Sequence, residues 1–267
     1  MRRVVFGLVA ALALGVVPSG AAGPSRAAQA SPLAGYLVRG MHVAPVRRLV
    51  VTSGAPARAV LTSLLRGPTA AERAQGYSTA IPPGTSLRGV TVANGVATVD
   101  LSPRFVAGGG SASMLLRVAQ VVHTATQFPT VGRVAFKIDG RLARSIGGEG
   151  VVTWPPVTRG NFEAEAPPIL VERPLPGDLV SHRVTVRGTA NVFEARLVVQ
   201  VRTTGGTLLA RRLVTATSGT GERGTFAVAV QAPATLRQAT VVVYTRSAKD
   251  GRPIDVVRIP VRPSPSR

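Results

Sequence analysis

Residues 87–101 read LRGVTVANGVATVDL, and this stretch decides the fold of the first half of the chain. Apolar and polar residues alternate in Leu87–Val92 and again in Val96–Asp100, a pattern typical of strands with one buried face. Asn94-Gly95 separates the two runs, and this dipeptide is the strongest short-range signal for a two-residue hairpin turn. The sequence therefore predicts an antiparallel hairpin here.

Helical patterns lie on both sides of this hairpin. A proline in the first turn and a stripe of leucines predict a helix over Pro56–Arg66. Ser111 follows three glycines and is predicted to be the N-cap of an amphipathic helix that ends near Gln127. A strand is predicted over Val134–Ile138. Together these elements indicate an α+β domain over residues 31–147.

The second half of the chain has no helical period. Its strand candidates are Ile169–Glu172, Arg183–Thr189, Glu194–Arg202, Leu208–Thr215, Thr225–Gln231, Ala239–Thr245 and Val256–Val261. Short strands at this spacing, separated by glycine- and proline-bearing turns, predict an all-β, immunoglobulin-like sandwich over residues 167–263. The chain contains no cysteine, so this sandwich lacks the usual disulfide. The proline-rich, aperiodic residues 148–166 are predicted to be an interdomain linker.

The first 30 residues have the pattern of a secretory signal peptide. Two arginines precede the apolar run Val4–Val17, which is shorter than the about 20 residues that a membrane-spanning helix needs. Cleavage is predicted between Ala30 and Ser31, with small residues near Gly20 as a competing site and an uncleaved signal anchor as the alternative. The sequence thus predicts an extracytoplasmic protein, secreted or associated with the cell envelope, with no transmembrane span after cleavage.

The chain is strongly basic and its charge is almost all arginine. The 267 residues carry a formal net charge of +20, and the only lysines are Lys137 and Lys249. The arginines are scattered, and the sequence contains no block of five like charges of the kind found in basic tails that bind nucleic acid. The predicted partners are therefore anionic wall polymers or envelope proteins, and not nucleic acid.

Several motifs resemble two known domains. The first half resembles the GerMN domain of sporulation and germination proteins, and the second half resembles Gmad2, the immunoglobulin-like domain of bacterial spore germination. The motifs of the first resemblance are Leu64–Pro68, Ile81–Thr85, Val99–Ser102, Gln120–Pro129 and Val134–Gly140. Those of the second are Pro174–Gly177, Val186–Ala195 and Gly224–Phe226. The two resemblances cover nearly all of the chain after the predicted signal peptide.

The resemblance implies an extracytoplasmic, non-catalytic protein of Gram-positive envelopes that binds ligands or partners. GerMN domains also occur in lipoproteins, whose lipid is attached to a cysteine. This sequence has no cysteine and therefore no lipobox, so lipid anchoring is not carried over from the resemblance.

Residues with catalytic or metal-binding chemistry are sparse. The three histidines, His42, His123 and His182, lack the spacing of a zinc site. Asp100 and Asp139 end neighbouring predicted strands, but capping of the strand ends explains them better than acid–base catalysis. No cofactor, metal or catalytic residue is therefore predicted.

Two further acidic or glycine-rich features are assigned structural roles. Glu194 is predicted to pair with a neighbouring arginine. Residues 219–224, GTGERG, match the dinucleotide-binding pattern letter for letter, but a strand and not a helix is predicted after them, so a hairpin loop is favoured.

One face of the predicted helix 111–127 is polar. Arg117, Gln120, Thr124 and Gln127 follow one another at helical spacing and form a candidate binding face. A polar stripe is also what any surface helix shows, so a solvated face is the favoured interpretation. His123 borders this stripe and is predicted to be solvated or at an interface.

The leading hypothesis is a secreted, non-catalytic envelope protein whose two domains bind envelope proteins or anionic wall polymers. Two alternatives remain open. One is an enzyme that acts on envelope glycans or peptides with Asp100, Asp139 and Glu194 as its acids. The other is an accessory or sensor ectodomain of a membrane signalling system.

Overall fold

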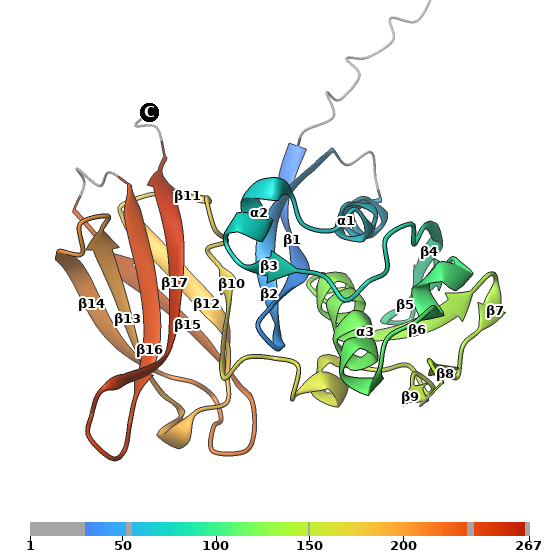
Figure 1. The fold of residues 1–267 in the computed structure, drawn as a ribbon. Coiled ribbons are helices and arrows are strands. Elements are labelled where there is room, and N and C mark those ends of the chain that lie inside the picture. The colour runs from blue at the N-terminus through green and yellow to red at the C-terminus, as the bar shows by residue number, and fades with distance from the viewer. Residues whose placement is uncertain (1–29, 52–54, 149, 234–237, 265–267) are drawn as a thin grey trace, which may run out of the picture.

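The computed structural model describes residues 30–51, 55–148, 150–233 and 238–264, which form two domains side by side (Figure 1). The predicted signal peptide lies outside the described residues, except for Ala30, which begins the first strand. Within the described part of the chain, no helix is both long and apolar enough to cross a membrane.

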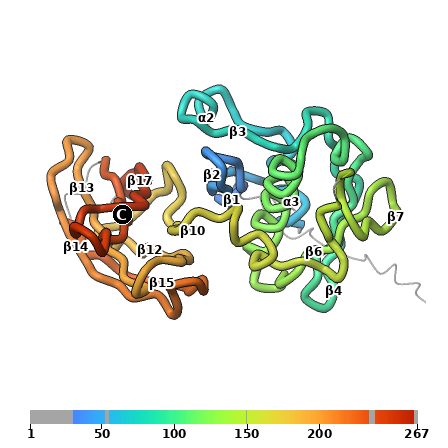
Figure 2. The backbone as a smooth tube through the Cα atoms, turned by 60° about the horizontal axis from the view of Figure 1, so that its bottom comes forward, coloured from blue at the N-terminus to red at the C-terminus, as the bar shows by residue number. Residues whose placement is uncertain are grey.

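Two sheets and a central helix build the first domain. The first sheet has the order β2-β1-β3 and the second has the order β4-β5-β6-β7. The strands are β1 (Ala30–Arg39), β2 (His42–Val51), β3 (Tyr77–Ser78), β4 (Leu87–Ala93), β5 (Val96–Leu101), β6 (Arg133–Ile138) and β7 (Arg141–Leu142), and the helices are α1 (Pro56–Leu65), α2 (Ala70–Ala74), α3 (Ser111–Ala125) and the short 3-10 helix η1 (Pro103–Val106). The α3 helix lies between the two sheets (Figure 2).

The predicted hairpin is confirmed. Asn94 and Gly95 have φ angles of 51° and 75°, which is the left-handed pair that a type I′ turn requires. They connect β4 and β5, which pair in antiparallel register from Ala93↔Val96 outward. The helix starting at Pro56 is also confirmed, whereas Ser111 is the first residue of α3 and Gly110 is its N-cap.

The segment 148–166, predicted to be a linker, packs against the first domain. It contains β9 (Val151–Val152), which pairs with β8 (Ser145–Ile146), and the 3-10 helix η2 (Arg159–Phe162). Val157 bridges to Val134 of β6, and Phe162 is 1% exposed within the core of the first domain. Single residues make these contacts, so the segment shows no apolar period in the sequence.

The second domain is a two-sheet sandwich, in agreement with the predicted class. Its sheets have the orders β10-β12-β15 and β11-β17-β16-β13-β14. The strands are β10 (Ile169–Arg173), β11 (Leu179–Val180), β12 (Arg183–Ala190), β13 (Arg196–Thr203), β14 (Leu208–Thr215), β15 (Gly224–Gln231), β16 (Ala239–Arg246) and β17 (Pro253–Pro263), with the 3-10 helix η3 (Phe193–Ala195) before β13. All seven predicted strands are present, and β11 is an additional short one.

Strand β10 contributes to the cores of both domains. Ile169 and Val171 lie in the core of the sandwich, whereas Leu170, which points the other way, lies in the core of the first domain together with Leu175. Alternate residues of a strand face opposite sides, so both sides of β10 are covered. This explains the continuous apolar run at 169–171, and it joins the two domains through shared packing.

Gly188 of β12 is expected to tolerate no side chain. A Cβ atom at this position would lie 2.1 Å from the carbonyl oxygen of Leu170 in the neighbouring β10. Gly188→Ala should therefore push the two strands apart and lower the free energy of unfolding by about 3 kcal/mol, the upper range for overpacking. Urea unfolding followed by circular dichroism measures this. Gly205→Ala, whose Cβ would meet only the Thr203 hydroxyl at 3.8 Å, is the control and should change stability little.

Candidate functional site

The polar stripe of α3, a candidate binding face from the sequence, is buried. Arg117, Gln120 and Thr124 are 2%, 0% and 0% exposed, so neither a solvated face nor a binding face exists there, and the prediction is wrong. The guanidinium of Arg117 donates to the backbone carbonyls of Ala80, Phe105, Ala107 and Gly108. Arg117 therefore holds together loops that meet at one side of α3.

The other three residues of the stripe form hydrogen bonds with the backbone of β1 at an edge where no strand pairs with it. The Gln127 amide exchanges two hydrogen bonds with the backbone of Ala34, at 2.9 and 2.7 Å. Thr124 accepts a hydrogen bond from the Tyr36 N–H at 3.0 Å, and Gln120 donates to the Tyr36 carbonyl at 3.0 Å. The short strand β3 pairs only with Val38 and Arg39 of β1, so these side chains satisfy the edge of β1 beyond it.

His123 is buried, so the prediction that it is solvated is wrong; it lies instead near residues of both domains. It is 2% exposed, and its ring lies 5.3 Å from that of Tyr36, centroid to centroid. Among the described residues, neither ring nitrogen has a hydrogen-bond partner. Burial, and then the positive charges of Arg159 and Arg223, lower the pKa of His123 well below its usual value. The imidazole is therefore neutral in the folded protein.

This burial predicts that acid destabilises the protein. Unfolding frees His123 to bind a proton near its usual pKa of 6.5, whereas the folded protein binds that proton only at much lower pH. The stability present above pH 6.5 should therefore fall as the pH is lowered below it. Urea unfolding at several pH values between 5 and 8 measures this. His123→Phe should flatten the dependence in this range, and an unchanged slope would exclude His123 as its source.

Next to His123, a polar cluster joins the two domains. The Tyr36 hydroxyl donates to the Glu172 carboxylate at 3.1 Å, and the Arg159 guanidinium forms an ion pair with the same carboxylate. Arg159 also donates to the Thr126 hydroxyl at 2.7 Å and to the His123 carbonyl at 3.2 Å. The cluster lines a cavity of about 120 Å³ and connects α3, η2 and β10. It holds the domains together, and we call it the interdomain latch.

The acids singled out in the sequence do not converge on one site. Asp100 accepts a hydrogen bond from the Gly140 N–H at 3.0 Å, so it caps the turn after β6. Asp139 pairs with Arg88 at 3.0 Å. Glu194 lies in the other domain and pairs with Arg196 at 3.5 Å, as predicted. Each acid therefore has a local structural role.

The glycine-rich loop 219–224 links β14 to β15, which belong to different sheets, so it is not a hairpin within one sheet. A Cβ atom on Gly219 would lie 2.6 Å from the Val192 carbonyl oxygen, and one on Gly224 would lie 2.2 Å from the Ser218 nitrogen. These two glycines are required by close backbone packing. As predicted, a strand and not a helix follows the loop, so the arrangement lacks the helix N-terminus that binds a dinucleotide.

The histidines and acids do not assemble a metal site in the described ranges, where no group of three potential ligands is close enough to hold an ion. His42 lies at the start of β2, His123 lies within α3, and His182 is exposed beside β12. No cofactor-binding constellation is brought together by these residues.

Several arginines lie on the outer face of the five-stranded sheet. Leu197, Val199 and Val201 of β13 point into the sandwich core, so the alternate residues of β13 and its neighbours point outward. The register of β14, β13, β16 and β17 places five outward arginines on this surface, which we call the arginine face: Arg196, Arg202, Arg211, Arg246 and Arg258. No outward position of β13, β14 or β16 is acidic.

Several arginines of this face have no acidic partner. Among the described residues, only Arg196 of the five lies within ion-pair distance of a carboxylate, that of Glu194. Arg202 donates instead to Gln200 at 2.7 Å and to the Gly206 carbonyl at 2.7 Å. Arg246 donates to the Gly251 carbonyl. The positive charge of the face is therefore not neutralised within this part of the chain.

A row of buried residues fixes the middle of the arginine face. Val198, Gln200, Val242 and Tyr244 are 3–7% exposed, although no helix or sheet of the described chain covers this side of the sheet (Figure 1). Gln200 donates to the Tyr244 hydroxyl at 3.1 Å. In register, Arg211 and Arg258 flank Gln200 and Val242, so their apolar stems shield the row while their charged ends reach solvent.

A shallow hollow lies at one end of this face. It has a volume of about 780 Å³ and is lined by Arg196, Arg211 and Arg246 together with the exposed apolar side chains of Phe193 and Leu213. Leu213 is 71% exposed and Phe193 is 58% exposed. Three cationic groups and the carboxylate of Glu194 thus surround the apolar ones. In the sequence, the signal for this site is the position of these arginines within predicted strands, which a count of scattered charges overlooks.

Comparison with known families assigns both halves of the chain. Residues 34–143 match the family Germane, described as sporulation and spore germination, and residues 168–252 match Gmad2, the immunoglobulin-like domain of bacterial spore germination. No curated protein matches the chain.

Two solved structures of the sporulation protein GerM from Bacillus subtilis are similar to the chain. Its first GerMN domain is 20% identical, with a TM-score of 0.42, and the match covers 49% of this chain and 98% of that one. Its tandem GerMN domains are 15% identical, with a TM-score of 0.43, over 76% of this chain and 62% of that one. The two family matches together show that this chain belongs to the proteins that carry a Germane sporulation and spore germination domain followed by a Gmad2 immunoglobulin-like domain.

Proposed function

We propose that this chain is an extracytoplasmic, non-catalytic binding protein that attaches to anionic polymers of the cell envelope through the arginine face. The observation that carries the proposal is the set of outward arginines on one sheet, of which Arg211, Arg246 and Arg258 lack an acidic partner among the described residues. Its two domains belong to spore germination families, and its first residues have the pattern of a signal peptide.

The chemistry of the arginine face fits a repeating anion. Arginine presents a planar fork of N–H donors that matches phosphate and carboxylate oxygens. Neighbouring strands lie about 4.8 Å apart, and Arg211 and Arg258 stand on either side of Gln200 and Val242, so a flexible polymer that crosses the sheet can contact both. Binding releases the counterions of the polymer, which makes the affinity depend strongly on salt. The exposed Phe193 and Leu213 add apolar contact at one end.

The non-catalytic part of the proposal rests on the roles of the acids. Asp100, Asp139 and Glu194 are each engaged in a cap or an ion pair, and they are divided between the two domains. Incubation of the purified protein with cell wall tests this point. We expect no release of reducing sugars or free amines, and sustained release above a heat-inactivated control would contradict it.

Retention on purified cell wall tests the binding directly. The protein should be retained at low salt and released as salt rises, because screening and counterion competition weaken contacts between exposed charges. Wall from which the anionic polymers have been extracted is the matched control and should retain much less protein. Retention that does not depend on salt, or equal retention on extracted wall, would overturn the proposal.

A further inference from the structure

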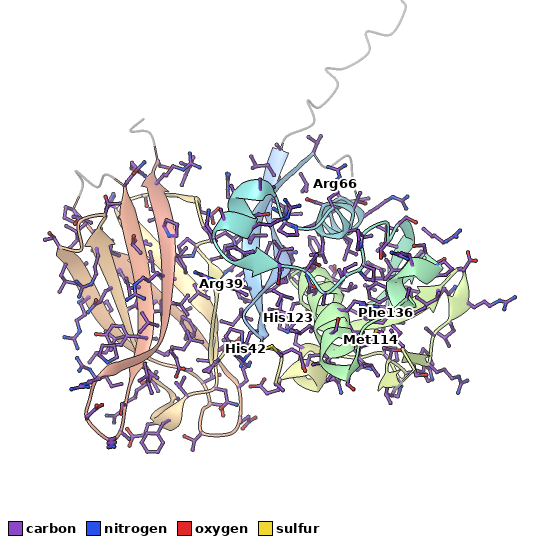
Figure 3. The ribbon with its side chains drawn as sticks, viewed as in Figure 1. Arg39, His42, Arg66, Met114, His123 and Phe136 are labelled. Carbon is purple, nitrogen blue, oxygen red and sulfur yellow. The ribbon has the colours of Figure 1, made fainter. Side chains whose placement is uncertain are left out.

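A second candidate binding site lies between the two domains. It is a groove of about 330 Å³ bordered by the start of β2, by β10 and by β17. Val43, Ile169, Val171 and Val257 contribute to its apolar walls. Arg39 and His42 lie on the side of the first domain that faces the second (Figure 3). The groove is separate from the hollow of the arginine face.

The edge of β17 is open at this groove. The Pro260 carbonyl accepts a hydrogen bond from the Gly177 N–H at 2.8 Å, and the Arg262 N–H donates to the Asp178 carbonyl at 3.0 Å, so both residues direct their backbone polar groups away from β16. Backbone polar groups alternate along a strand, and Arg258 therefore directs its N–H and C=O to the same side.

Nothing in the described part of the chain pairs with this open edge at Arg258. Strand β11 covers β17 only at Arg262 and Pro263. Pro260, which has no N–H, blocks further pairing in that direction. The backbone N–H and C=O of Arg258 form no hydrogen bond on this side with any described residue, and Arg258 lines the groove. An unpaired strand edge of this kind is a template for an added strand.

A second open edge faces the same groove. In β10, the Pro168 carbonyl accepts from the Asn191 N–H at 2.8 Å, which places the polar groups of residue 168 on the β12 side. By the same alternation, Ile169 and Val171 direct theirs away from β12. Both residues line the groove. An extended chain in the groove would therefore meet backbone groups of β10, as well as of β17, that have no partner within the described ranges.

The charge of the groove is positive. Arg39, His42 and Arg258 are among its lining residues, and none of its lining residues is acidic. The Arg39 guanidinium lies 5.4 Å from the centroid of the Tyr77 ring, which holds it at the rim, and Arg39 has no carboxylate within ion-pair distance among the described residues. The complementary ligand carries acidic side chains next to apolar ones.

We propose that this groove binds an extended acidic segment of a partner protein, which adds as a short strand to the open edge of β17 at Arg258. Main-chain hydrogen bonds supply part of the affinity, and alternate apolar side chains enter the walls. Acidic side chains on the other face of the segment lie near Arg39. This site takes a peptide, whereas the arginine face takes a polymer.

The test uses a fluorescein-labelled acetyl-Val-Glu-Val-Glu-Val-amide peptide and the full chain. Arg258→Pro removes the N–H, whereas Arg258→Ala keeps it, and both remove the same charge. Fluorescence anisotropy should show that Arg258→Pro binds the peptide about five- to tenfold more weakly than Arg258→Ala, the effect of one lost hydrogen bond at equal charge. A peptide that is N-methylated at its central residue should bind the wild-type protein more weakly by a similar factor.

Charge is tested separately. Arg39→Glu should weaken binding of the glutamate peptide by about tenfold or more. It should strengthen binding of the same peptide with lysine in place of both glutamates. Arg66→Glu, at the end of α1 and outside the lining of the groove, is the control with the same charge change (Figure 3). Equal binding by the proline and alanine variants, or by the methylated and unmethylated peptides, would overturn the proposal. Because binding of polyphosphate should fall equally in both Arg258 variants, failure of the groove is distinguishable from failure of the arginine face.

Discussion

Replacing Arg117 with methionine is expected to lower the free energy of unfolding by about 3 kcal/mol, because four backbone carbonyls, in one buried and three partly buried contacts, lose their donor at once. Arg117 is 2% exposed, and its guanidinium donates to Ala80, Phe105, Ala107 and Gly108. Methionine fills much of the volume of the arginine stem, so the loss reports the hydrogen bonds more than a cavity. Urea unfolding followed by circular dichroism measures it.

Arg104→Met is the matched control for this prediction. Like Arg117, Arg104 donates to a backbone carbonyl, that of Pro83, but its side chain is exposed. Water can replace that donor, so the variant should change stability by less than about 0.5 kcal/mol. If both variants were equally stable, Arg117 would not have the structural role that its contacts indicate.

The second large effect is expected at the interdomain latch. Arg159→Met removes the cation that neutralises Glu172 and the donor to Thr126 and to the His123 carbonyl. Breaking a buried pair costs about 3–5 kcal/mol, and the side chains of this pair are 24% and 28% exposed, so we expect about 2–3 kcal/mol. Differential scanning calorimetry should also show the two domains unfolding in more widely separated transitions, because the latch joins them.

Arg196→Met provides the comparison for the latch variant. Arg196 pairs with Glu194, but the two side chains are 77% and 53% exposed, and such pairs contribute little. We expect a change in unfolding that is within measurement error. If Arg159→Met gave the same calorimetric profile as Arg196→Met, the domains would be joined by the packing of Leu170 and Leu175 and not by the latch.

Local patterns predict the strands and the first helix of this protein well. Asn94 and Gly95 adopt the left-handed conformation that their dipeptide favours, and the apolar alternation in the second half predicts every long strand of the sandwich. These features depend on neighbours in sequence. The run Ile169–Val171 is apolar on both faces, and its reason becomes visible only when β10 is found between two cores.

The stripe on α3 shows where local patterns do not suffice. Gln120, Thr124 and Gln127 have the spacing of a solvated helix face, and the same spacing serves a helix that satisfies the edge of β1. The difference depends on β3 being only two residues long, which leaves the edge of β1 that faces away from β2 without a strand partner at Ala34 and Tyr36. Apart from Arg117, the stripe contains uncharged amides and a hydroxyl, where a surface helix usually carries lysine and glutamate. This difference is the signal in the sequence that the stripe is not solvated.

The arginine face could not be predicted from the sequence for a related reason. Arg211 and Arg258 are far apart in sequence, and only the pairing of β14, β13, β16 and β17 places them on one surface. Alternation along a single strand predicts which residues share a face, but the order of strands in the sheet comes from the fold. Charge composition alone therefore predicts an anionic partner, but it does not predict which surface binds that partner.

The measurement that tests the central claim most directly is the salt dependence of polyphosphate binding by two charge-matched variants. One carries alanine at Arg211, Arg246 and Arg258 of the arginine face, and the other carries alanine at the exposed Arg58, Arg66 and Arg73 of the first domain. Each loses three positive charges. In a plot of log affinity against log salt, the slope of the first should decrease in magnitude by about 2, at about 0.7 per lost contact, while the second keeps the wild-type slope. Equal slopes for the two variants would contradict the account.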